Sequence, residues 1–154
     1  MTQISGRLAG PGRPAPAYDR AMTRFVVDSS AVIHIAKSHL EIPAKHELLA
    51  PTLLRSQSLS ALHESVHTGE LGASEARDLL AHAGPPRLKI RLLGDAVLRR
   101  VAWELADQLG WASTYDAEYL ALARLQADAF ITLDPDLAKS AEGIVPLASI
   151  DALR

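Results

Sequence analysis

Residues Thr114–Ala141 form the stretch TYDAEYLALARLQADAFITLDPDLAKSA, and this stretch decides the fold class. Tyr115–Ala127 is almost wholly apolar, which is typical of a buried helix. Ala129–Leu133 is a short β-rich run that predicts a strand, and Pro135–Ala141 follows as a short helix with proline at its first position. A helix, a strand and a helix in immediate succession indicate an α/β fold.

The same alternation extends through the rest of the chain and predicts a mainly parallel sheet with helices on both faces. The other expected strands are Arg24–Val27, Glu47–Ala50 and, at an edge of the sheet, Ile144–Leu147. The other expected helices are Ala31–Ser38, Leu53–His67 ending at Gly69, a helix capped by Ser74 that runs to Ala83 before the break at Gly84-Pro85-Pro86, and Asp95–Leu109 ending at Gly110.

The composition fits one globular domain. We expect residues 1–22, rich in Gly, Pro and Ala, to form a flexible tail, and residues 23–154 to form the domain. The sequence has no apolar run long enough to span a membrane, no secretory h-region and no cysteine, so we expect a cytoplasmic protein. The net charge of −2 gives no general attraction to nucleic acid, so any such binding needs a local patch or a metal ion.

Three aspartates occupy related places in the expected fold. Asp28 follows the first strand, Asp134 follows the strand Ala129–Leu133, and Asp116 lies in the first turn of the apolar helix. The carboxyl ends of parallel strands share one edge of a sheet, and ligands bind at that edge. Clustered carboxylates repel each other unless a cation neutralises them, and oxygen ligands suit Mg²⁺ or Mn²⁺. The sequence therefore predicts a divalent-metal site at this edge.

Each aspartate also has an ordinary structural interpretation. Asp28 and Asp134 can cap the helices that follow them, and Pro135 at the first helical position fits a cap at Asp134. Asp116 can complete a capping arrangement with Ser113. Their common placement at one sheet edge is what favours the metal site.

Three runs carry a family resemblance. VVDSSAVI (Val26–Ile33), TYDAEYLALA (Thr114–Ala123) and ITLD (Ile131–Asp134) resemble the successive acidic motifs of PIN-domain nucleases, most closely those of the VapC toxins of bacterial VapBC toxin–antitoxin pairs. The resemblance spans roughly residues 23–150. It implies a three-layer α/β/α fold, an RNA substrate cut with Mg²⁺ or Mn²⁺, a homodimer, and a cognate VapB-like antitoxin as partner.

The resemblance also assigns roles to residues. It places Asp28, Asp116 and Asp134 in the acidic metal-binding pocket, and it makes Ser30 and Thr132 hydroxyls that orient those carboxylates. VapC-like chains usually carry a glutamate early in the helix after the second strand. This sequence has Gln57 there, which offers a carbonyl oxygen without the charge. We expect Gln57 to orient the attacking water or to act as a weak neutral ligand, and we expect weaker metal binding.

A zinc-protease motif competes with this interpretation. His63-Glu64-Ser65-Val66-His67 matches H-E-x-x-H, in which two histidines bind zinc and the glutamate is the base. On a helical wheel both histidines fall largely opposite the apolar side, and Ala73 stands where a metzincin has its third histidine. A zinc metalloprotease therefore remains a remote alternative.

Basic and aromatic residues leave further choices open. Arg87–Arg91, with Arg99 and Arg100, is the densest basic stretch. It fits phosphate contacts with RNA and the outer face of a half-buried strand equally well. For Trp103 and Trp111, a place in the core or in an interface is favoured over base stacking.

The sequence thus predicts a metal-dependent endoribonuclease in which a water activated by the metal attacks the phosphate in line. The alternative is a PIN-fold module that binds RNA or a protein without cutting, because Gln57 weakens the site.

Overall fold

The structure is a computed structural model that describes residues 22–83 and 87–154. The tail expected over residues 1–22, apart from Met22, and the break expected at residues 84–86 lie outside the described residues. In chain order the elements are β1 (Thr23–Val27), α2 (Ser29–Ser38), β2 (His46–Pro51), α3 (Leu54–His67), α4 (Ala73–His82), β3 (Ile90–Leu93), α5 (Ala96–Leu109), α6 (Tyr115–Gln126), β4 (Ala129–Ile131), α7 (Pro135–Ala141) and a 3₁₀ turn (Ile150–Leu153).

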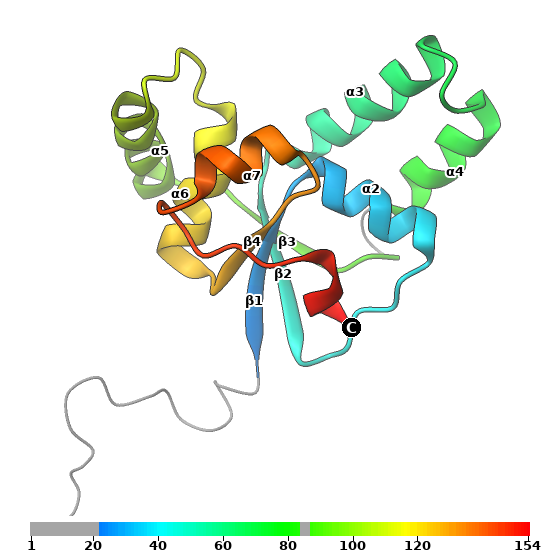
Figure 1. Cartoon of the computed structure of the whole chain (residues 1–154). Helices are drawn as coiled ribbons and strands as arrows, with labels where there is room; N and C mark the ends of the chain where they lie inside the picture. The colour runs from blue at the N-terminus through cyan, green and yellow to red at the C-terminus, as the bar shows by residue number, and fades with distance from the viewer. Residues whose placement is uncertain (1–21, 84–86) are drawn as a thin grey trace, which may run out of the picture.

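The four strands form a parallel sheet in the order β3-β2-β1-β4. Phe25 of β1 lies opposite Leu48 of β2 on one side and Ala129 of β4 on the other. The chain steps from β1 to β2 to β3 and then crosses back to β4. Because such crossovers are right-handed, α2 to α4 cover one face and α5 and α6 the other (Figure 1). The predicted three-layer α/β/α class is confirmed.

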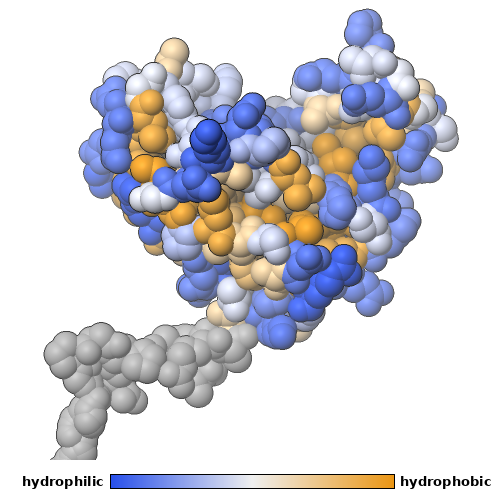
Figure 2. Space-filling view, in the orientation of Figure 1, coloured by the Kyte–Doolittle hydropathy of each residue, from blue (hydrophilic) through white to orange (hydrophobic). Residues whose placement is uncertain are grey.

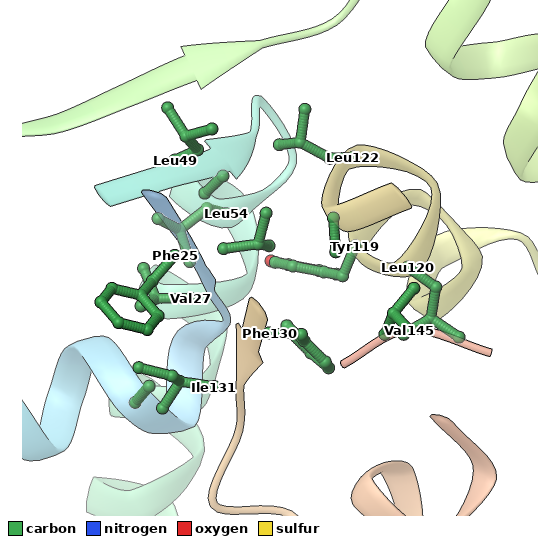
Figure 3. Packing of buried hydrophobic residues seen from close by; sticks show 14 of the residues in the cluster. Phe25, Val27, Leu49, Leu54, Tyr119, Leu120, Leu122, Phe130, Ile131 and Val145 are labelled. Carbon is green, nitrogen blue, oxygen red and sulfur yellow. The ribbon is translucent and has the colours of Figure 1, made fainter. Parts of the chain in front are cut away.

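Helix α6 is the centre of the core, as its apolar sequence predicts. Tyr119 and Phe130 are among the largest fully buried side chains, and their ring centroids lie 6.2 Å apart. Figure 3 shows the Tyr119 ring directed from α6 toward the sheet. Burial of the middle of this helix, at Ala117 and Tyr119–Ala123, fixes the position of its first turn, where Asp116 lies.

The last expected strand is not formed. Residues Ile144–Leu147 make a single parallel bridge, between Leu147 and Phe130. The N–H of Phe130 donates to Pro146 O at 2.9 Å, and the N–H of Ala148 donates to Phe130 O at 3.0 Å. Proline has no N–H to extend the ladder, so pairing stops after one residue. Strand β4 is likewise shorter than expected and ends at Ile131.

Two helix starts and one tryptophan also differ from expectation. Helix α2 begins at Ser29, because the Asp28 carboxylate caps it. Helix α4 begins at Ala73 after Gly72, and Ser74 is not its cap. Trp103 is 66% exposed on α5, so of the two places expected for it the core is wrong and an interface stays a prediction.

The helices α2, α3, α6 and α7 all begin near the carboxyl edge of the sheet (Figure 1). In the space-filling view the molecule is hollowed here, between the part formed by α5 and α6 and the part formed by α3 and α4 (Figure 2). Across the described residues, none of the helices has the length and apolar character needed to span a bilayer.

Candidate active site

Asp28 is a buried carboxylate held at the end of β1. Its Oδ1 accepts hydrogen bonds from Ser30 Oγ at 2.6 Å and from the N–H of Ala31 at 3.0 Å. Its Oδ2 accepts from the hydroxyl of Thr132. Buried polar groups are stable where hydrogen bonds replace water, and this network holds the Asp28 carboxylate in one position.

The hydroxyls of Ser30 and Thr132 also tie the end of β1 to the end of β4. Ser30 Oγ accepts from the N–H of Leu133 at 2.8 Å, and Thr132 Oγ1 accepts from the N–H of Asp134 at 3.1 Å. Each hydroxyl therefore orients Asp28 and fixes the backbone that leads to Asp134. Strands β1 and β4 flank the point where the strand order reverses, which is where open α/β sheets bind ligands.

Asp134 caps α7, as its ordinary interpretation predicts, yet only one of its oxygens is used. Its Oδ1 accepts from the N–H groups of Asp136 at 2.9 Å and Leu137 at 3.3 Å. The side chain is exposed at the mouth of the site. The other oxygen, Oδ2, is available to a ligand.

Asp116 lies in the first turn of α6 at the surface of the same site. The capping arrangement with Ser113 is not formed, because Ser113 Oγ accepts from the N–H of Tyr115 instead. Partial burial, then the nearby carboxylates of Asp134 and Asp28, raise the pKa of Asp116. Asp116 thus lies near enough to Asp134 and to Asp28 to feel the charge of each.

Gln57 reaches the site from the first turns of α3. Its Oε1 accepts a hydrogen bond of 2.7 Å from the hydroxyl of Tyr119 on α6. Burial, followed by the charges of Asp28, Asp116 and Glu118, raises the pKa of Tyr119 far above its ordinary value, so this hydroxyl keeps its proton. Tyr119 therefore holds the Gln57 amide in one orientation, with Nε2 turned away from the bond.

Sequence reasoning missed Tyr119. The residue lies three positions after Asp116, on the same side of α6, and its hydroxyl is the polar group in an otherwise apolar run. A buried tyrosine hydroxyl usually has a partner, and this expectation could have pointed to Gln57.

The oxygen donors fit a hard divalent cation in chemical type. Across residues 22–83 and 87–154, no three His, Cys, Asp or Glu side chains are close enough together, as placed, to hold one ion. Mg²⁺ is commonly bound by one or two carboxylates, with waters and substrate phosphate completing its shell. Asp116 accepts no hydrogen bond within the described residues, so its side chain can move toward an ion, whereas Asp134 is exposed but held by the two N–H groups that it caps.

The solved structure of PAE2754 from Pyrobaculum aerophilum is similar to this structure. The match has a TM-score of 0.61 and 22% sequence identity, and it covers 86% of this chain and 94% of that chain. The two chains share a fold. No known family model and no curated protein matches the sequence.

The competing sequence patterns lie away from this site or lack its geometry. His63 and His67 are exposed on α3, as the helical wheel predicts. In the basic stretch, Ile90 is buried on the edge strand β3, and Arg91 pairs with Glu47 at 3.5 Å. This placement fits the half-buried strand. Trp111 is partly buried and packs against the core.

Proposed function

We propose that this chain is a divalent-metal-dependent endoribonuclease of the PIN type, with Asp28, Asp116 and Asp134 as its acidic centre. The observation that carries the proposal is their convergence at the reversal point of the sheet. There the hydroxyl of Thr132, at the end of β4, donates to Asp28 at the end of β1 and accepts from the N–H of Asp134. Asp116 lies near enough to Asp134 and Asp28 for their charges to raise its pKa. Such a cluster of like charges suits a cation and, beside it, a phosphodiester.

Each residue has a distinct part in the proposed reaction. Asp28 is a carboxylate fixed by its hydrogen bonds, and Asp134 offers the oxygen that accepts no hydrogen bond from the described residues. Asp116 feels the charges of both other aspartates, which raise its pKa in the absence of an ion, and would complete the set of carboxylates around the cation. Mg²⁺ or Mn²⁺, held by these carboxylates, would lower the pKa of that water and offset charge on the phosphoryl oxygens.

We further propose the biological setting that the motif resemblance implies: a cytoplasmic toxin that forms a homodimer and is silenced by a VapB-like antitoxin. The runs around Asp28, Asp116 and Asp134 support this setting. Co-expression with a neighbouring antitoxin-like reading frame should restore growth that the chain alone arrests.

The test is cleavage of mixed single-stranded RNA by the purified full chain with Mg²⁺, Mn²⁺ or EDTA. We expect cleavage that needs the metal and is lost in Asp116→Asn. Asp78→Asn, a matched change of an exposed aspartate on α4, should cut normally. RNA binding without cleavage under every metal condition would favour the non-catalytic binding module, which the neutral Gln57 already makes the second candidate.

A further inference from the structure

Beside the carboxylates lies a recess that the proposed reaction does not use. It has a volume of about 420 Å³ and is lined by the segment between α5 and α6, the start of α6, and Gln57. That size is within the range of small-ligand pockets, ~300–1,000 Å³. Asp116 belongs both to this recess and to the acidic centre, so a ligand in the recess would directly adjoin the reacting phosphate.

Two aromatic side chains form part of the recess. Gly110 ends α5 with a left-handed backbone, and the N–H of Trp111 then donates to Ala106 O at 2.8 Å. This turn directs Trp111 back onto the core and fixes its position. Tyr115 opens α6 and is 60% exposed, directly before Asp116. An exposed aromatic ring and a fixed one therefore both line the recess.

Apart from Asp116, the side chains that line the recess are uncharged. The lining has no Lys or Arg, and its single charged group is the Asp116 carboxylate, so it disfavours a second phosphate. Because Tyr119 occupies Gln57 Oε1, the Nε2 group of Gln57 is the part of the amide left to donate. A neutral, planar ligand with hydrogen-bond acceptors at its edge matches this lining.

We infer that the recess is a subsite for one unpaired nucleobase of the RNA, adjacent to the phosphate that is cut. Tyr115 and Trp111 contact the base, and Gln57 Nε2 donates to its edge. The inference rests on the proposed function for the phosphate beside the base. Stacking on aromatic side chains tolerates all four bases, so the subsite selects single-stranded RNA rather than a particular sequence.

The test measures binding of a short fluorescein-labelled single-stranded RNA by anisotropy, with Ca²⁺ in place of Mg²⁺. Tyr115→Ala should weaken binding about fivefold or more, and Tyr115→Phe, which keeps the ring, should bind as the unchanged protein does. Trp103→Ala is the matched control, since Trp103 is an exposed aromatic on α5 outside the recess. An RNA of the same length with abasic riboses should bind the unchanged protein and Tyr115→Ala equally.

A second readout uses Trp111 itself. In Trp103→Phe, Trp111 is the single remaining tryptophan of the chain, and its emission should be quenched as RNA saturates the protein. Equal affinities for the unchanged protein and Tyr115→Ala, or unchanged Trp111 emission at saturation, would overturn the inference. Neither readout needs cleavage. A protein that binds as expected but never cuts would contradict the proposed function and leave the inferred subsite intact.

Discussion

At the scale of single residues, Asp116 is the aspartate of the site whose negative charge is least favourable in the absence of a cation. Its pKa is raised by burial and by Asp134 and Asp28, so the folded protein holds this proton more tightly than the unfolded chain does. The ionised carboxylate therefore costs stability, and the cost develops as pH rises from the ordinary aspartate pKa through the raised one. Below that window the cost disappears.

Asp116→Asn should accordingly be more stable than the unchanged protein at pH 8 in EDTA, by no more than ~1 kcal/mol because the group is exposed and screened. The difference should vanish near pH 4. Urea unfolding at both pH values measures it. Added Mg²⁺ should stabilise the unchanged protein at pH 8 and leave the variant nearly unaffected. A variant that is less stable than its parent at pH 8 would show that Asp116 experiences no repulsion.

The substitution Gln57→Glu tests the effect of charge alone, because it keeps the shape of the side chain and the new carboxylate can still accept the hydrogen bond from Tyr119. The extra negative charge should lower the Mg²⁺ concentration for half-maximal cleavage about 5- to 30-fold, or ~1–2 kcal/mol of a partly screened interaction. Mn²⁺ should help the natural Gln57 protein more than Mg²⁺ does. The measurement is a metal titration of cleavage rate at fixed RNA and pH. Coincident curves would place Gln57 away from the ion.

At the scale of elements, Thr132 is where β4, α7 and the end of β1 meet. Thr132→Val keeps the volume but leaves the buried Asp28 carboxylate short of a donor, and it removes the acceptor for the N–H of Asp134. We expect a loss of ~1–3 kcal/mol in the free energy of unfolding and a large loss of cleavage. Thr132→Ser restores a hydroxyl and should recover both.

The matched control for this change is Asp95→Ala. Asp95 caps α5 by accepting from the N–H of Leu98 at 2.8 Å, and it is not part of the site. Its loss should cost ~1 kcal/mol of stability without reducing cleavage by the folded protein. If both variants lost activity in proportion to stability, Thr132 would act only as a structural residue.

Element type was more predictable than element ends. The buried helix α6 and the αL end of α5 at Gly110 follow directly from an apolar run and a glycine. The residues Ile144–Leu147 look like a strand because their composition is apolar, but strand formation needs a partner with matching free N–H and C=O groups, and Pro146 supplies only half. Amino-acid composition alone does not show whether such a partner is present.

The candidate site was predictable to a similar extent. Asp28, Asp116 and Asp134 could be named because strand ends and helix starts share an edge in any parallel sheet. The bond between Gln57 and Tyr119 could not, because it joins residues 62 positions apart, on α3 and α6, whose approach depends on the long-range packing of the whole domain. The recess beside Asp116 depends on the same long-range packing.

At the scale of the whole molecule, the described domain is held together from its first strand residue, Thr23. The N–H of Thr23 donates to Lys45 O at 2.8 Å, and β1 pairs with β2 from Thr23 onward. Deletion of residues 1–21 should therefore change the free energy of unfolding by no more than ~0.5 kcal/mol, as for a surface change. Urea unfolding of both forms, with cleavage measured in parallel, checks this. A large loss of stability would mean that the domain begins earlier than residue 22.

The two edges of the sheet have a consequence for assembly. At one edge, the exposed residues Lys89, directly before β3, and Arg91, on β3, are charged; at the other, β4 is three residues long and already bonded to the segment around Pro146. Short, charged or proline-covered edges cannot template an incoming strand. Among the described residues, edge-to-edge pairing of two copies is therefore disfavoured, and we expect the proposed homodimer to pack through helix surfaces.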